Sequence, residues 1–242
     1  MIRQEDIKKL STKYQISPLA IAREYCQHNI LAGIYSNELS RKLLFKGGTA
    51  LRIVYQSPRF SEDLDFTGVQ NITYYEIEKL LTETLVNLDT WGLNLDINEA
   101  KKTTGGYLGK INFRLYSYKI LIHLKISFRQ SHKKTERKIS SIKNDYIHTY
   151  SIIHLPLIEI INGKIAALMS RSKPRDWYDL YFFLHSQMLN NKQKHQLPKI
   201  LQKLKRTEIN FKKELKEFLP RSHHLILKDF KSILIREIDK NI

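Results

Sequence analysis

Three stretches between Leu93 and Phe128 alternate apolar and polar residues, and this alternation constrains the fold more than any other feature of the chain. The stretches are LNLDIN, GKINFRLYS and YKILIHLKISF, with the Gly105-Gly106 pair between the first and the second. A period of two places the apolar side chains of a strand on one face. We therefore expect three neighbouring antiparallel strands with one buried face.

The hydrophobic period changes to 3.6 beyond Pro156, which is typical of amphipathic helices. Helices are expected around Leu157 to Arg171, Asp176 to His185, Leu197 to Lys205 and Leu225 to Ile238, and a further one earlier, from Thr73 to Trp91. The predicted fold class is α+β: a mixed sheet flanked by helices, followed by a C-terminal helical bundle. The polar stretch from His132 to Tyr150 suggests two domains, residues 1–150 and 151–242.

Charge and cysteine content restrict the partners and the compartment. The 242 residues include 41 Lys and Arg against 24 Asp and Glu, a formal net charge of +17 that attracts polyanions. RNA or DNA is the expected partner, and a solvated basic surface without a dedicated partner is the alternative. Cys26 lies in an apolar-periodic segment, so we expect it to be buried in a protein of a reducing compartment. No secretory signal or membrane span is evident, and we expect a cytoplasmic protein.

A short apolar run, Leu43 to Phe45, stops at Gly47-Gly48, and the following TALRIVY segment has helical patterning. Glycines let the backbone come close to a ligand, and the start of a helix offers free N–H groups to phosphate. A lone pair of glycines before a helix is more often only a tight turn. The glycines therefore need support from a second element.

Asp63 and Asp65 supply that element, because alternate residues of a strand point to the same face. Two adjacent carboxylates repel each other unless a cation lies between them, and hard oxygen ligands suit Mg²⁺, or Mn²⁺, bound jointly with phosphate oxygens. Leu64 and Phe66 would then face the core. Two solvated aspartates at a strand end are the alternative for the pair alone, but its position beside the glycine turn favours a nucleotide site.

Two blocks resemble a known family. Leu44 to Phe66, LFKGGTALRIVYQSPRFSEDLDF, is similar to the first motif of the AbiEii/AbiGii nucleotidyltransferase toxins, relatives of the MenT toxins in the polymerase-beta-like superfamily. The segments from Glu159 to Arg171 and from Lys173 to Leu180 resemble the later helical motif, with its lysine and its Arg-Asp-x-Tyr-Asp element. The resemblance implies a nucleotidyltransferase fold and activity.

The resemblance also implies the site residues. The implied catalytic residues are Asp63, Asp65, Lys164 and Asp176, of which Asp63 and Asp65 hold the metal; the implied nucleotide-binding residues are Lys46, Gly47, Gly48, Thr49, Ser61 and Arg171. Lys164 would contact phosphate and Asp176 would be the general base, with Asp179 positioning Asp176 or Arg175. Without the resemblance, Lys164 and Arg171 could be a solvated basic stripe and Asp176 a helix cap.

The activity that the resemblance implies is Mg²⁺-dependent transfer of a nucleoside monophosphate from an NTP to RNA, with tRNA as the acceptor. The protein would be the toxin of a toxin-antitoxin or phage-defence system, countered by an antitoxin that is a DNA-binding regulator. The basic segments Arg129 to Lys138 and Lys192 to Lys216 are the predicted RNA contacts. The predicted strand of IHLKISF carries Lys125 where the superfamily commonly has a third carboxylate. That departure leaves three alternatives open: Asp176 supplies the missing carboxylate, the chain uses fewer metal ligands, or the protein is a catalytically degenerate nucleotide- or RNA-binding regulatory module. A metal-dependent nuclease that uses the same carboxylates is a further alternative.

Overall fold

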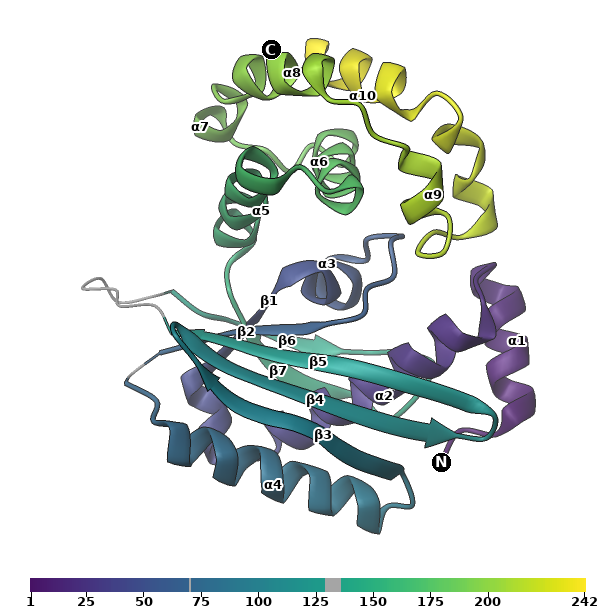
Figure 1. The fold of residues 1–242 in the computed structure, drawn as a ribbon, viewed down its shortest axis with the longest axis vertical. Coiled ribbons are helices and arrows are strands. Elements are labelled where there is room, and N and C mark those ends of the chain that lie inside the picture. The colour runs from purple at the N-terminus through teal and green to yellow at the C-terminus, as the bar shows by residue number, and fades with distance from the viewer. Residues whose placement is uncertain (70, 129–135) are drawn as a thin grey trace. The chain divides into compact units, whose positions relative to one another are not determined.

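The chain folds into two compact units, Met1–Pro156 and Leu157–Ile242 (Figure 1). The structure, a computed structural model, describes residues 1–69, 71–128 and 136–242. Most of the basic segment from residue 129 to 138 therefore lies outside the described residues. The division falls after the last strand, six residues beyond the expected boundary between residues 150 and 151, because Tyr150–His154 pairs with other strands of the first unit.

The first unit is built on a seven-stranded sheet with the order β3-β4-β5-β2-β1-β7-β6. The strands are β1 (Leu43–Lys46), β2 (Leu64–Gly68), β3 (Asn94–Thr103), β4 (Gly106–Leu115), β5 (Tyr118–Phe128), β6 (Lys138–Ile142) and β7 (Tyr150–His154). The predicted antiparallel trio, β3 to β5, is confirmed. The sheet is mixed, because β2 runs parallel to β5 and antiparallel to β1, and β1 runs parallel to β7.

Helices cover the apolar face of β3 to β5. The helical elements of the first unit are α1 (Gln4–Tyr14), α2 (Pro18–Tyr35), the 3-10 helix η1 (Glu38–Lys42), α3 (Gly47–Tyr55) and α4 (Tyr74–Thr90). Helix α2 contacts β5 and α4, and α4 contacts β3. Thr73 and Glu76 form a capping box that fixes where α4 begins. Figure 1 shows α3 on the other side of the sheet from α4.

Side-chain burial along the central strands follows the alternation in the sequence. The apolar residues of β4 and β5 are buried at alternate positions, as are Leu64 and Phe66 of β2. Helix α2 is buried almost all round, and its Cys26 is fully buried as predicted. The polar side chains at the intervening positions of the strands are therefore free to form the opposite face.

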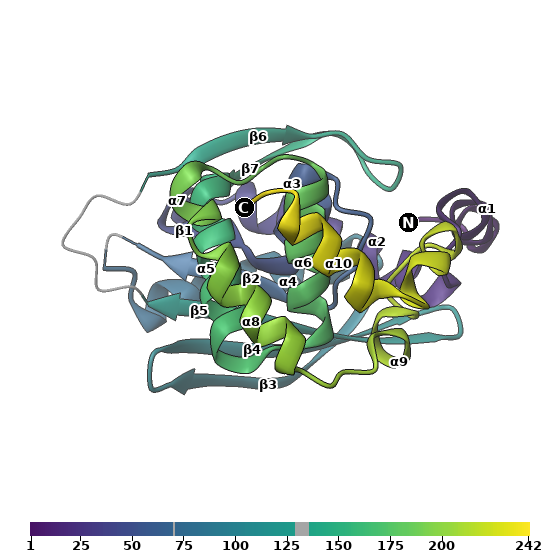
Figure 2. The ribbon, with the colours of Figure 1, turned by 90° about the horizontal axis from the view of Figure 1, so that it is seen from above.

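The second unit is helical, as predicted. Its elements are α5 (Leu157–Arg171), α6 (Pro174–His185), α7 (Asn191–Lys194), α8 (Leu197–Arg206), α9 (Phe211–Leu215), the 3-10 helices η2 (Arg221–His223) and η3 (Leu225–Leu227), and α10 (Phe230–Asp239). Figure 2 shows these helices seen from above. Trp177, Tyr178, Phe183 and Phe230 are among its fully buried side chains. Within the ranges that the structure describes, no helix is both long and apolar enough to cross a membrane.

Candidate nucleotide-binding site

The turn between β1 and α3 is packed so closely that a side chain at either of its two glycines would force neighbouring atoms to shift. Gly47 has a φ of +84°, and a Cβ atom there would overlap the Asp65 carboxylate. A Cβ on Gly48 would lie 2.6 Å from Nη2 of Arg59 and 2.9 Å from Oγ of Ser61. The glycines therefore do more than permit a turn: they let the start of α3 lie directly against the acidic strand and the loop before it.

The two aspartates lie beside this turn, as the strand pattern predicts. Leu64 and Phe66 are fully buried, so the alternate positions Asp63 and Asp65 share the opposite face. Asp65 is in register with Lys46 of β1 on one side and with Lys125 of β5 on the other. The carboxylate pair is thus at the beginning of the central strand of the sheet, with Asp63 just before β2 and Asp65 within it.

Hydrogen bonds to backbone carbonyls hold the segment that leads into β2. The buried hydroxyl of Thr49 donates to the carbonyl of Asp63 and joins the first turn of α3 to the carboxylate pair. Gln27 is 1% exposed, and its Nε2 donates to the carbonyls of Ser61 and Glu62, at 3.0 Å each. The buried guanidinium of Arg59 donates to the carbonyl of Phe60 at 3.1 Å.

Gln27 and Arg59 are site-supporting residues that the sequence reasoning missed. Two features of the sequence could have pointed to them: Gln27 is a polar residue inside the apolar pattern of α2, and Arg59 lies two positions before Ser61. Neither signal indicates which carbonyls such a side chain would reach.

Two basic side chains of β5 contact Asp63. Nζ of Lys125 forms an ion pair with one carboxylate oxygen, and Nδ1 of His123 lies 3.2 Å from the other. Lys125 therefore faces the site, as the strand pattern predicts, whereas the contact of His123 is not apparent from the sequence. On the other side of Asp65, Lys46 donates to the Ser127 hydroxyl at 2.5 Å.

The donor set suits a divalent ion that is shared with a nucleotide. Among the described residues, no group of three or more His, Cys, Asp and Glu side chains is arranged to hold a metal ion. Mg²⁺ is commonly held by one or two carboxylates together with the phosphates of a substrate. Asp63 and Asp65 provide such a pair, and the closely packed glycine turn beside Asp65 leaves backbone rather than side chain next to it. The residues present therefore fit the ion, provided that phosphate oxygens complete its coordination.

The predicted residues of the second unit form two ion pairs. Nζ of Lys164 lies 2.7 Å from Oδ2 of Asp179, whose side chain is fully buried. Arg171 donates to both oxygens of Asp176 at 2.9 Å, so its guanidinium engages the carboxylate through two parallel bonds. The partner of Lys164 is thus Asp179, which the sequence reasoning placed beside Asp176 or Arg175. The predicted contacts of Lys164 and Arg171 with nucleotide, and the predicted role of Asp176 as a base, stay predictions.

A mixed sheet that presents a carboxylate pair next to a glycine turn at the start of a helix has the architecture of a nucleotidyltransferase. Solved structures agree on the fold. MenT4, a nucleotidyltransferase toxin from Mycobacterium tuberculosis, superposes with a TM-score of 0.66 at 13% identity, covering 99% of this chain and 90% of that one. JHP933 from Helicobacter pylori superposes with a TM-score of 0.59 at 19% identity, covering 93% of this chain and 95% of that one.

The sequence profile of one family, the nucleotidyl transferase AbiEii toxins of type IV toxin-antitoxin systems, matches residues 29–241. The chain therefore belongs to the AbiEii family of nucleotidyltransferase toxins. No curated protein matches its sequence. The match spans both units, so the helical second unit belongs to the family architecture as much as the sheet does.

Proposed function

We propose that this protein transfers a nucleoside monophosphate from an NTP to an RNA acceptor, with tRNA as the acceptor, in a reaction that needs Mg²⁺. The single observation that carries the proposal is the placement of Asp63 and Asp65 on one strand face, against a glycine turn at the start of a helix. Family membership supports the transfer of a nucleotidyl group. The metal and the acceptor are the parts that the proposal adds.

The triphosphate lies at the start of α3 in this proposal. The backbone N–H groups of the first helical turn, beginning at Gly47 and Gly48, are not used within the helix and favour an anionic ligand. Ser61, whose hydroxyl lies next to Gly48, donates a further hydrogen bond to phosphate. Arg59 packs against Gly48, and Gln27 holds the backbone of Ser61, so these donors are in place before the nucleotide binds.

Asp63 and Asp65 would hold the divalent ion that the reaction needs. A bound Mg²⁺ polarises phosphate oxygens and neutralises the charge that develops on them. Asp63 and Asp65 would hold the ion from one strand face, and Asp63 would give up at least part of its contact with Lys125 to do so. The acceptor hydroxyl attacks the α-phosphorus and forms a new P–O bond, the bond to the leaving pyrophosphate breaks, and the hydroxyl proton passes to a base.

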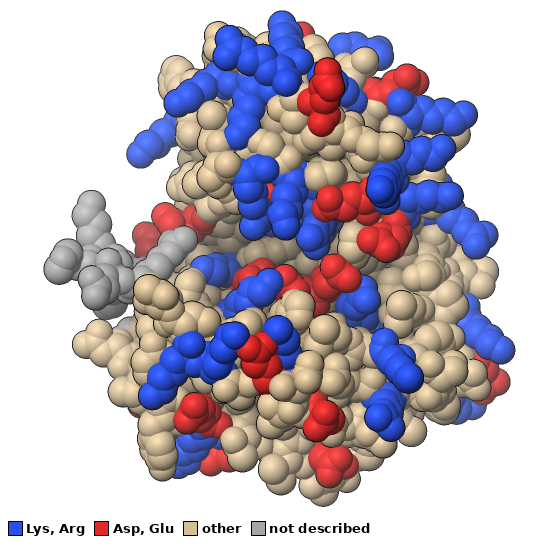
Figure 3. All heavy atoms as spheres, viewed as in Figure 1, with Lys and Arg blue, Asp and Glu red and all other residues tan. Residues whose placement is uncertain are grey.

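The charge of the protein supports a polyanionic acceptor. The net charge of +17 is a large excess of positive charge, and Figure 3 shows Lys and Arg over much of the face in view. A field of that sign raises the rate of encounter with RNA and makes the binding dependent on salt. The basic helices between Lys192 and Lys216 are proposed to contribute to it. The family description names a type IV toxin-antitoxin system, and we propose a cognate antitoxin, a DNA-binding regulator, as a further partner.

Labelled NTPs, Mg²⁺ and total tRNA, incubated with the purified protein, test the proposal. Transfer of label to tRNA is expected, with a loss of roughly 100-fold or more in Asp63→Asn, equivalent to about 2.7 kcal/mol of transition-state stabilisation. Asp89→Asn, at an exposed position on α4, is the matched control and should keep full transfer.

Three outcomes would contradict the proposal. Tight RNA binding without transfer in the wild-type protein would instead indicate a regulatory module whose Asp63 is permanently paired with Lys125. Shortened RNA products formed without any NTP would indicate a nuclease. Transfer that persists unchanged in Asp63→Asn would show that the carboxylate pair is not the reacting site.

A further inference from the structure

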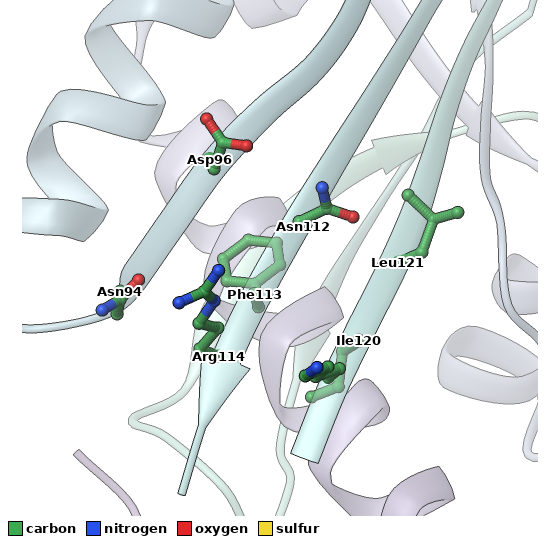
Figure 4. Close-up of a pocket in the computed structure, with 8 residues that line it drawn as sticks. Asn94, Asp96, Asn112, Phe113, Arg114, Ile120 and Leu121 are labelled. Atoms are coloured by element: carbon green, nitrogen blue, oxygen red, sulfur yellow. The ribbon is translucent and has the colours of Figure 1, made fainter. Parts of the chain in front are cut away.

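Polar side chains form two rows across the face of β3, β4 and β5 that is opposite the buried face. The strand register places Asp96, Asn112 and Leu121 in one row and Asn94, Arg114 and Lys119 in the next. Together with two residues from the other face, these side chains line an open cavity of about 480 Å³ (Figure 4). The cavity lies entirely within the first unit.

This surface continues the strand face that carries the carboxylate pair. Along β5, the alternate residues Lys125, His123, Leu121 and Lys119 share one face. Lys125 and His123 contact Asp63, and Leu121 and Lys119 line the cavity. With a rise of about 3.3 Å per residue, the four-residue step from His123 to Lys119 spans about 13 Å. The cavity therefore begins directly beside the proposed reaction site and leads away from it along the strands.

The side chains of the two rows suit the polar groups of nucleotides. Asn94 and Asn112 each carry an amide that donates and accepts, which can pair with the edge of an exposed base. Arg114 adds fixed donors and a flat guanidinium plane, and Lys119 adds a second cation for phosphate. Arg114 and Lys119 are both exposed. Leu121 is 40% exposed and offers an apolar contact between these polar groups.

The geometry favours a single strand over a duplex. Proteins recognise double-stranded RNA mainly by its shape and its backbone, whereas unpaired ends are read by hydrogen bonds to splayed bases on open surfaces such as sheets. An exposed sheet face that places amide side chains beside two neighbouring cations matches the second mode. The direction of the surface, from the reaction site outward, matches a strand whose last hydroxyl reacts.

We propose that the cavity lined by Asn94, Asp96, Asn112, Arg114, Lys119 and Leu121 binds the single-stranded terminal nucleotides of the RNA acceptor. The inference rests on the proposed function, since it names the surface on which the acceptor of that reaction lies. The cavity positions the terminal hydroxyl near Asp63 and leaves the glycine turn to the NTP.

Binding of a short single-stranded RNA oligonucleotide is the first test. Arg114→Gln combined with Lys119→Gln should raise the dissociation constant by roughly tenfold or more. The slope of log affinity against log salt should fall by about 0.7 for each phosphate that the variant no longer neutralises. Lys79→Gln is the matched control, because Lys79 is 52% exposed on α4 and lies against the opposite face of the sheet. Equal affinities for the double variant and the control would overturn the inference.

Steady-state transfer kinetics separate failure of this inference from failure of the proposed function. The double variant should raise KM for the RNA acceptor by roughly tenfold or more while KM for the NTP stays within about twofold. Normal RNA kinetics in the double variant, with a wild-type protein that transfers label, would reject the cavity but keep the activity. A wild-type protein that labels no RNA at all would reject the proposed function and the inference with it.

Discussion

Replacement of Gly47 by alanine tests whether the glycine turn and the acidic strand form one packed unit. At a φ of +84°, alanine costs about 1–2 kcal/mol in backbone strain alone. The new Cβ would overlap the Asp65 carboxylate, which must turn away from its preferred rotamer at a further cost of about 0.5–1.5 kcal/mol. The free energy of unfolding of Gly47→Ala should therefore fall by about 1.5–3.5 kcal/mol.

Gly92→Ala separates the two costs. Gly92 has a φ of +86°, but a Cβ there would meet nothing within 4 Å. It should therefore lose only the backbone contribution of about 1–2 kcal/mol. Urea unfolding monitored by circular dichroism gives the two free-energy changes under the same conditions. Mn²⁺ and NTP binding measured on the folded variants should weaken in Gly47→Ala alone, because only that substitution displaces Asp65.

Adding Asp65→Ser to Gly47→Ala shortens the side chain that the new Cβ meets. Cβ of residue 65, which would lie 2.9 Å from the new Cβ, remains in serine, so only the overlap with the carboxylate is relieved. The stability of the double variant should therefore lie between those of Gly47→Ala and Gly92→Ala, and metal binding should not recover. The reasoning would be refuted if Gly47→Ala unfolded like Gly92→Ala and bound Mn²⁺ and NTP like the wild-type protein. In that case the glycine would serve the turn alone.

Three further predictions concern buried groups. Burial lowers the pKa of His28 from 6.5 to about 4, so the stability that its neutral imidazole contributes is present above pH 6.5 and is lost as the pH falls toward about 4. The full loss is worth about 3 kcal/mol, and His28→Gln should flatten this pH dependence of the free energy of urea unfolding. An unchanged pH dependence in His28→Gln would contradict the prediction. Lys164→Met should destabilise the protein by about 3–5 kcal/mol, because it removes the cation beside the fully buried Asp179. Adding Asp179→Asn should restore part of that stability, as measured by thermal unfolding. Burial raises the pKa of the Cys26 thiol to about 12, so a thiol-specific reagent should react at the rate of unfolding, and fast reaction with the native protein would contradict the burial.

The sequence predicts the elements of this fold better than it predicts the partners of their side chains. The antiparallel trio and the helices beyond Pro156 follow from periodicity, because one buried face imposes its own spacing on the residues. The sequence does not predict strands β6 and β7, because each has only five residues and β6 lies inside the polar stretch from His132 to Tyr150. Pairing of β7 with β1 joins residues far apart in the sequence, and local patterning carries no signal for such a pairing.

For the candidate site, too, the sequence predicts positions along one strand better than contacts between elements. The position of Asp63 and Asp65 on one strand face follows from the alternation, and so does the inward orientation of Lys125. The contact between His123 and Asp63 depends on the register of β5 against β2, which the sequence does not specify. The ion pair of Lys164 with Asp179 likewise depends on how α5 packs against α6. Spacing along one element is readable from the sequence, but pairing between elements is set by tertiary packing.

Lys125 changes how the carboxylate pair can work. Two aspartates on one strand face repel each other, and the ammonium of Lys125 offsets part of that repulsion at Asp63. A divalent ion that arrives without a nucleotide would have to displace this lysine and would find only two carboxylates among the described residues. A triphosphate that bound with the ion would supply further oxygen ligands, and its oxygens would accept hydrogen bonds from the Lys125 ammonium in place of Asp63. Metal and nucleotide binding at this site should therefore be coupled, and the lysine is the group whose exchange of partners couples them.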